Sequence, residues 1–280
     1  MGQLYTRMES DLTLKGLSDA TRREYLRNAR QFVAHFMRSP AEMGEAEARQ
    51  YLHHLLDRGA SVSTRKMATA AIKFLYVRTL GRPQEVATIP WPKAPETLPE
   101  IFSRDELRAL FAQADSALLR AAFLTSYGSG ARLSETCTLR PGDIDSARGV
   151  IHIHLGKGKK DRLTLLSPKL LAELREWWKA RPRVDSPYLF PGQTSDAHVS
   201  RRHLQDGFGR AVRHAGVTRS VTFHSIRHSF ATHMLEAGVD IRIIQAMLGH
   251  KNIKTTTRYA QVRAEHFAHL PDPLALLEPR

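Results

Sequence analysis

A tyrosine in the stretch LGHKNIKTTTRYAQV, Leu248 to Val262, is placed where it could act as a nucleophile. Tyr259 lies nine residues after His250, among lysines, threonines and an arginine. A free phenol has a pKa near 10, so at neutral pH it is almost entirely protonated and reacts poorly. Tyr259 would therefore need neighbours that favour its phenolate form and stabilise an anionic transition state.

The segment TFHSIRHSFATHMLEAG supplies two such neighbours on one predicted helix. Ile226, Phe230 and Met234 recur every four residues, a spacing that predicts the buried face of a helix. His224 and Arg227 are three residues apart, so they lie together on an adjacent face.

Two further segments contribute charged groups. SGARLSETCTL places Arg132 and Glu135 three residues apart, and Gly130 allows the backbone to turn just before them. Lys157 lies in the lysine-rich tip of a predicted hairpin. The same hairpin carries three cations that compete with Lys157 for any role as a proton donor: Lys159, Lys160 and Arg162.

Together these residues have the types needed for attack on a phosphodiester. That reaction requires a nucleophile, neutralisation of the non-bridging oxygens, and a proton for the departing oxygen. Tyr259 is the candidate nucleophile, and Arg132 and Arg227 present planar forks that match phosphate oxygens and remain charged. A histidine, with an unperturbed pKa near 6.5, can donate or accept a proton.

In order and spacing, these motifs resemble those of the tyrosine recombinases of the phage-integrase and Xer type. The resemblance covers essentially the whole chain, including a helical N-terminal part that in this family grips the opposite face of the DNA. The matching motifs are G-x-R-x-x-E at Arg132, G-K-G at Lys157, H-x-x-R at His224 and Arg227, L-G-H at His250, and the nucleophile position at Tyr259.

The resemblance implies a site-specific DNA recombinase that forms a 3′-phosphotyrosyl bond and releases a 5′-hydroxyl. By resemblance, Lys157 would protonate the leaving oxygen. His224 and His250 would hydrogen-bond the phosphate and help to move the tyrosine proton, and Glu135 would orient an arginine or a histidine. Because the phosphotyrosyl bond retains the energy for rejoining, we expect no metal, no nucleotide and no other cofactor, in keeping with a sequence that lacks a GxxxxGK[ST] loop.

The partners implied by the resemblance are double-stranded DNA and further copies of the chain. The family acts as four protomers on two paired DNA sites, so a homo-oligomer, a tetramer on DNA, is expected. The reaction would serve the integration, excision or resolution of DNA elements, including mobile ones.

Three other readings of the same residues remain open. A relaxing topoisomerase would use the same chemistry but rejoin the original strands, and a DNA-binding regulator related to the recombinases would not cut DNA at all. A metal-dependent nuclease would need a metal site, for which His224 and His228, four residues apart and near His233, are a weak candidate because no carboxylate or cysteine accompanies them.

The elements that must position these groups are mostly helices. Hydrophobic periodicity and capping residues predict helices at about 18–36, 45–57 and 64–78, and then at about 169–180, 201–214, 222–237 and 241–248. GVIHIHLGKGKKDRLTLL alternates apolar and polar residues around a turn, which predicts a β-hairpin. The expected fold class is mainly α with a small β-sheet.

Prolines divide the chain into two predicted domains. GRPQEVATIPWPKAPETLP contains five prolines and predicts a linker at 83–99. A helical domain is then expected at 1–82, and the resemblance implies that it is a core-binding (SAM-like) domain. An α+β catalytic domain is expected at 100–280, beginning with a capping box formed by Ser103 and Glu106. The leucine-rich tail after Leu270 is expected to dock in trans on a neighbouring subunit.

Composition indicates a polyanionic partner. Lys and Arg total 42 against 28 Asp and Glu, giving a net charge of +14 over 280 residues. Such a charge attracts nucleic acid, and Arg23, Arg27, Arg65 and Lys66 are candidate backbone contacts. Cys137 is the single cysteine and is expected to be buried, which excludes a disulfide framework. The sequence shows neither a secretory signal nor a membrane-length apolar run, so a cytoplasmic location is expected.

Overall fold

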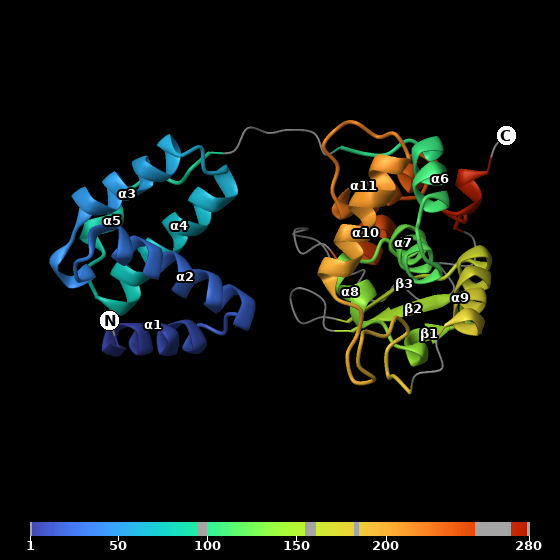
Figure 1. The fold of residues 1–280 in the computed structure, drawn as a ribbon, viewed down its shortest axis with the longest axis horizontal. Helices are drawn as coiled ribbons and strands as arrows, with labels where there is room; N and C mark the ends of the chain where they lie inside the picture. The colour runs from blue at the N-terminus through green and yellow to red at the C-terminus, as the bar shows by residue number, and fades with distance from the viewer. Residues whose placement is uncertain (1, 94–99, 155–160, 182–184, 250–269, 279–280) are drawn as a thin grey trace. The chain divides into compact units, whose positions relative to one another are not determined.

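The chain divides into two compact units, Met1–Thr97 and Leu98–Arg280, drawn in Figure 1. The computed structural model describes residues 2–93, 100–154, 161–181, 185–249 and 270–278. Most elements are helices, and a three-stranded sheet lies in the second unit, which confirms the predicted fold class. Within the described ranges, no helix is long and apolar enough to cross a bilayer.

The first unit is a helical bundle around a core of its own. Ser18 caps α2 by accepting a hydrogen bond from the Thr21 amide, and Ala29 and Phe32 face the core as the periodicity predicted. Its elements are α1 (Gly2–Leu14), α2 (Asp19–Phe36), η1 (Pro40–Glu42), α3 (Glu45–Asp57), α4 (Val62–Phe74), η2 (Leu75–Thr79) and α5 (Gln84–Ala87).

The structure differs from the sequence prediction at both ends of this unit. α1 was not predicted, yet it buries Met8 and Leu12. At the other end, Val86 and Ile89 are buried in the same core, and Lys73 donates a hydrogen bond to the Val86 carbonyl. The beginning of the proline-rich segment is therefore part of the bundle rather than linker, because its apolar side chains find a surface to pack on.

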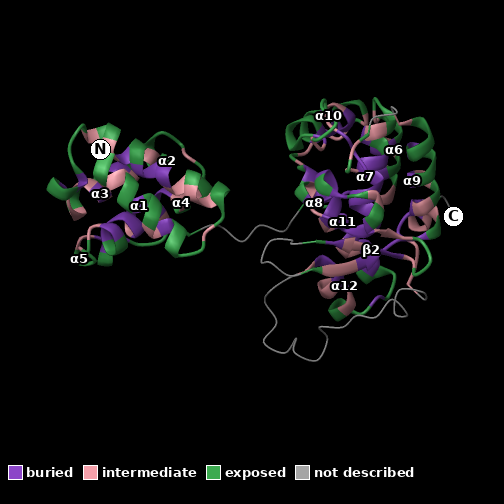
Figure 2. Ribbon diagram, turned by 90° about the horizontal axis from the view of Figure 1, so that it is seen from below, coloured by how far each residue is buried: buried purple, intermediate pink, exposed green. Residues whose placement is uncertain are grey.

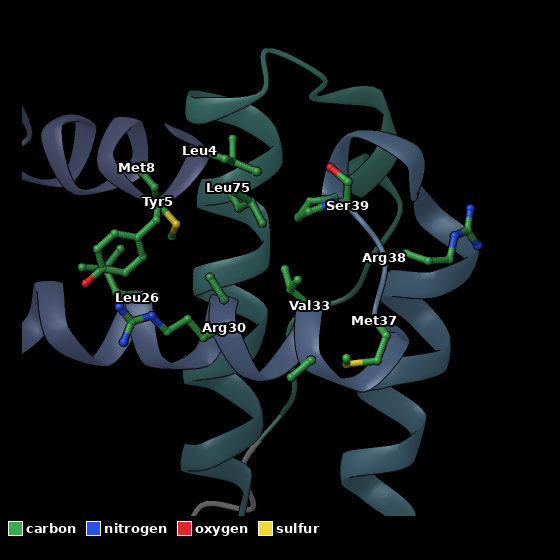
Figure 3. A pocket seen from close by; sticks show the side chains of 13 residues that line it. Leu4, Tyr5, Met8, Leu26, Arg30, Val33, Met37, Arg38, Ser39 and Leu75 are labelled. Carbon is green, nitrogen blue, oxygen red and sulfur yellow. The ribbon is translucent and has the colours of Figure 1, made fainter. Parts of the chain in front are cut away.

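An open apolar cavity of about 550 Å³ lies between α1 and α2 of the first unit. Its wall includes Leu4, Met8 and Leu75 (Figure 3), and Arg30 covers the Tyr5 ring at 4.2 Å from its centroid. Of the candidate catalytic residues that the structure describes, Arg132, His224 and Arg227, none lines this cavity.

The second unit is built around α7, which is buried along most of its length (Figure 2). α7 packs against α9, α11, α10, α8 and strand β3. The helices of this unit are α6 (Arg104–Ala112), α7 (Ala117–Ser129), α8 (Leu133–Thr138), η3 (Pro141–Asp143), α9 (Pro168–Ala180), α10 (Arg201–His214), α11 (Phe223–Glu236), α12 (Ile241–Leu248) and η6 (Ala275–Leu277).

The sheet confirms the predicted hairpin. β2 (Val150–Ile153) and β3 (Arg162–Leu165) are antiparallel, with Ile153 opposite Arg162. A short strand that was not predicted, β1 (Ile144–Asp145), pairs with the other edge of β2. His154, on the polar side of the hairpin, forms an ion pair of 3.0 Å with Asp143 when protonated.

The described part of the C-terminal tail packs on its own unit, in contrast to the predicted docking in trans. Leu274 and Leu277 are buried in the core of the second unit, and Asp272 accepts a hydrogen bond from the Lys169 amide at the start of α9. The apolar side chains of the tail, which were predicted to contact a neighbouring subunit, are thus covered by the tail's own unit.

Candidate active site

The turn between α7 and α8 positions Arg132. Gly130 ends α7 in the left-handed conformation, with φ +65°, which a residue with a Cβ adopts only at a cost. A Cβ at this position would lie 2.7 Å from the Phe230 ring and 2.8 Å from Leu248. Glycine therefore allows α7, α11 and α12 to meet immediately before Arg132.

Glu135 is the centre of the charged cluster. Its carboxylate accepts hydrogen bonds from the Arg132 amide (2.7 Å) and from Arg132 Nη1 (2.9 Å). It also accepts a two-pronged contact from Arg162, with Nη1 at 2.8 Å and Nη2 at 2.7 Å. Arg227 Nη1 is 4.0 Å from the same carboxylate. Sequence reasoning gave Glu135 an orienting role, and these contacts are consistent with it.

The C-terminus of α12 joins the three arginines to one another. Its last carbonyls have no partner within the helix and carry the negative end of the helix dipole. The Met247 carbonyl accepts from Arg162 Nε at 2.6 Å, the Leu248 carbonyl from Arg227 Nη2, and the Gly249 carbonyl from Arg132 Nη2 at 3.5 Å. Residues remote in sequence thereby meet at the point where the chain continues to His250.

The three arginines differ in their access to solvent. The Arg227 side chain is only 4% exposed and that of Arg162 9%, whereas Arg132 is 21% exposed. Arg227 also donates to the Gly130 carbonyl at 2.6 Å. Arg132 is therefore the most accessible guanidinium of the cluster to a bound ligand, with Arg227 beneath it.

The cluster carries an excess of positive charge. Among the described residues, Glu135 is the carboxylate that all three guanidinium groups share. Burial lowers the pKa of Arg227 to about 9, and the charges of Arg132 and Arg162 add to that effect. Burial alone would raise the pKa of Glu135, but Arg162 and then Arg132 lower it to about 2. Such an arrangement favours an anionic ligand.

His224 lies in the first turn of α11 and is exposed. Its ring meets that of His228 edge to face, with centroids 4.7 Å apart. Burial, and then the charge of Arg227, lower the pKa of His228, so that ring is neutral at neutral pH. His233, the third histidine of the weak metal hypothesis, points into the core and hydrogen-bonds the Tyr127 hydroxyl at 2.9 Å.

Three predicted site residues lie outside the described residues: Lys157, His250 and Tyr259. The elements beside them in the chain are described. Lys157 falls between β2 and β3, and His250 directly follows Gly249, which ends α12 with φ +64°.

Arg162 is the residue of this cluster that sequence reasoning misplaced. It was grouped with the lysines of the hairpin tip, whereas the structure places it at the first position of β3 with its side chain directed to Glu135 and Met247. The signal available in the sequence was weak, since an arginine at the end of a lysine-rich turn resembles the cations beside it.

Comparison with known families identifies both units. Residues 100–266 match the phage integrase family, and residues 4–86 match the phage integrase N-terminal SAM-like domain. A putative integrase/recombinase of Sinorhizobium fredii is 36% identical over 99% of this chain and 90% of its own length. The tyrosine recombinase XerA of Thermococcus kodakarensis is 34% identical over 96% of this chain and 94% of its own.

Solved structures share the fold. A lambda integrase dimer bound to a core site superposes with a TM-score of 0.74 at 17% identity, covering 90% of this chain and 95% of that one. At such low identity the likeness concerns the fold alone.

Proposed function

The chain belongs to the phage integrase family, and from this premise we propose that it is a tyrosine-type site-specific DNA recombinase. It cuts a DNA strand, holds the end as a 3′-phosphotyrosyl intermediate, and rejoins it to another strand. Relatives that match nearly the whole chain, among them the XerA tyrosine recombinase, support the proposal.

One observation of the structure carries the chemistry: three guanidinium groups converge on a single carboxylate. These groups carry more positive than negative charge, and rigid elements hold them: the turn after α7, helix α11 and strand β3. An anion therefore meets donors that are already in place. Arg132 and Arg227 bind the non-bridging oxygens of the scissile phosphate, and the geometry of a guanidinium fork suits that task. Such preorganised charge is often the largest contribution to catalysis.

In the proposed cleavage step the Tyr259 oxygen attacks phosphorus and its proton passes to His224 or His250. A bond forms between that oxygen and phosphorus, and the bond from phosphorus to the 5′-oxygen breaks. Lys157 gives a proton to the departing 5′-oxygen. In rejoining, a 5′-hydroxyl of the partner strand gives its proton to Lys157 and attacks the phosphotyrosine. A bond from that 5′-oxygen to phosphorus forms, the phosphotyrosyl bond breaks, and Tyr259 recovers its proton from the histidine.

The histidines assist this exchange. His224, exposed in the first turn of α11 and three residues before Arg227, hydrogen-bonds the phosphate and is able to move a proton. His250 shares that role, and Glu135 fixes Arg132 through both its backbone amide and its side chain.

The partners we propose are double-stranded DNA and other copies of this chain, four on two paired sites. The net charge of +14 supports DNA binding. A lambda integrase tetramer bound to a Holliday junction has the same fold at a TM-score of 0.71, which is consistent with assembly on DNA.

A covalent-capture experiment tests the proposal. Nicked duplexes with randomised sequence around the nick are incubated with the protein, so that cleavage releases a short strand and traps the adduct. Denaturing gels and sequencing then recover the attached DNA. We expect an adduct in wild type, no adduct in Tyr259→Phe, and the same adduct in the presence of a chelator.

The matched control is Tyr188→Phe, which retains the ring contacts of Tyr188 with Arg140 and His198 and should cleave like wild type. An adduct that still forms with Tyr259→Phe would contradict the assignment of Tyr259 as the nucleophile. Loss of cleavage in the presence of a chelator would favour a metal-dependent nuclease. With paired target sites, recombined junctions support recombination, whereas relaxed circles alone would indicate a topoisomerase.

A further inference from the structure

Arg162 is almost completely enclosed by protein. It begins β3, opposite Ile153 of β2, and β3 packs against α12. Both terminal nitrogens of its guanidinium donate to Glu135, and Nε donates to the Met247 carbonyl. Because Nε and both terminal nitrogens already donate to acceptors of the protein, two of them to one carboxylate, Arg162 is poorly placed to meet DNA itself.

The contact with Glu135 determines what that carboxylate can do for Arg132. Two parallel hydrogen bonds from one fork fix the plane of the carboxylate as well as its position. Held in this way, Glu135 offers Oε1 to the Arg132 side chain and Oε2 to the Arg132 amide. A carboxylate without the fork could rotate towards Arg227, whose Nη1 is 4.0 Å away.

The contact with Met247 fixes a second part of the site. α12 ends at Leu248, and the chain goes on through Gly249 to His250 and Tyr259. Arg162 lies so close to Gly249 that a Cβ there would come within 2.9 Å of Arg162 Cδ. One side chain therefore determines both the arginine clamp and the point from which the nucleophile segment leaves α12.

We propose that Arg162 is a positioning residue for DNA cleavage, which aligns Arg132 through Glu135 and anchors the end of α12 without touching the phosphate. This role rests on the proposed recombinase function. Misplacement of reacting groups by about 1 Å can slow an enzyme on the order of 100-fold, so the loss should appear in the cleavage rate rather than in DNA affinity.

A pH profile separates positioning from a general effect on folding. Arg162 lowers the pKa of Glu135 against its burial more than any other group does. Among the described residues, the other charged groups that face this carboxylate are Arg132 and Arg227. In Arg162→Gln the pKa of Glu135 rises, because its burial is then opposed by fewer hydrogen bonds and charges, and protonation of Glu135 releases Arg132. Cleavage by this variant should then decline with falling pH more steeply than wild-type cleavage, and from a higher pH.

The experiment measures single-turnover cleavage of captured nicked DNA, DNA affinity and thermal stability for three variants. Arg162→Gln should cleave roughly 100-fold more slowly than wild type while binding DNA within about threefold. Arg162→Lys keeps the positive charge and the aliphatic part of the side chain but loses the planar guanidinium. This variant should cleave roughly 10-fold more slowly than wild type, without the steeper pH dependence. Arg175→Gln, an exposed change on α9, should match wild type.

Each outcome decides the proposal. Wild-type rates and pH profile in Arg162→Gln, or wild-type rates in Arg162→Lys, would overturn it. If Arg162→Gln fails to fold, Arg162→Lys alone decides. The proposed function is tested separately by the wild-type adduct and its loss in Tyr259→Phe, so an inactive wild type would count against the function and not against Arg162.

Discussion

At the scale of single residues, one buried carboxylate organises the candidate site. Glu135 is 6% exposed and receives hydrogen bonds from Arg132 and Arg162. A buried carboxylate with such partners stays ionised far below its usual range. The stability of the catalytic unit is therefore coupled to the protonation of the group that supports the phosphate clamp.

This coupling predicts an acid-dependent loss of stability. The pKa of Glu135 is lowered from 4.5 to about 2 in the folded protein. A depressed folded-state pKa contributes stability that is fully present above the unfolded value and lost as pH falls towards the folded value. Glu135→Gln should therefore be less stable than wild type at pH 7, by on the order of 3 kcal/mol, and this difference should shrink between pH 4.5 and 2.

Urea unfolding of both proteins across this range measures the difference. Glu106, whose pKa the hydrogen bond from Arg219 lowers to about 2, titrates in the same window. The comparison between variants removes its contribution because both proteins contain it. Glu176→Gln, on the exposed face of α9, should track wild type at every pH. A Glu135→Gln difference that stayed constant down to pH 2 would contradict the assignment.

At the scale of elements, the site exists because three helix ends and one strand meet. α7 ends at Ser129, α8 begins after Arg132, α12 ends before Gly249, and β3 begins with Arg162. The Gly130 carbonyl also accepts a hydrogen bond from Arg227, so the turn contributes to the site directly. The packing of these ends is therefore as important as the identity of the charged side chains.

Gly130→Ala tests this packing. The substitution combines backbone strain at φ +65° with a clash of the new methyl group against Phe230 and Leu248. We expect a loss of about 3 kcal/mol or more in unfolding free energy, from strain plus overpacking, together with slower cleavage because Arg132 is displaced.

Substitutions at two other glycines separate the contribution of backbone strain from that of overpacking. Gly216 has φ +73°, and a Cβ there would meet no atom within 4 Å, so Gly216→Ala should show strain alone, about 1 kcal/mol. Gly142 has neither feature, and Gly142→Ala should be close to neutral. Thermal or urea unfolding measures all three, and equal losses at Gly130 and Gly216 would show that packing at the turn contributes nothing.

At the scale of the whole molecule, charge determines how the protein meets DNA. An excess of 14 positive charges should make binding depend steeply on salt, because bound phosphates release counterions. If each protomer neutralises about 6 to 10 phosphates, the slope of log affinity against log salt should be about −5 to −9.

Single substitutions show which side chains contribute to this salt dependence. Lys66 is exposed on α4 of the first unit, and Lys66→Gln should reduce the slope by about 1 if the ammonium contacts a phosphate. Lys179 on α9 is similarly exposed but pairs with Glu176, and Lys179→Gln should leave the slope unchanged. DNA titrations at several salt concentrations give the slopes. A wild-type slope near zero would rule out DNA binding through contacts between cationic side chains and phosphates.

The amino-acid sequence was enough to predict the family and most of the local structure. The order and spacing of Arg132, Lys157, His224, Arg227, His250 and Tyr259 predicted the family, and local periodicity and caps predicted helices such as α3, α10 and α12 at their observed bounds. These are short-range properties, because a helix depends on residues three and four apart and on its cap.

Which charged groups contact one another depends on the tertiary fold and could not be predicted from the sequence. Residues 135 and 162 are paired, 162 and 247 are paired, and the tail folds back on its own unit. α1 and the segment around Ile89 likewise become ordered by packing on a core that their own sequence does not reveal. Such contacts join segments far apart in the chain, and their energies depend on burial and geometry that no local pattern encodes.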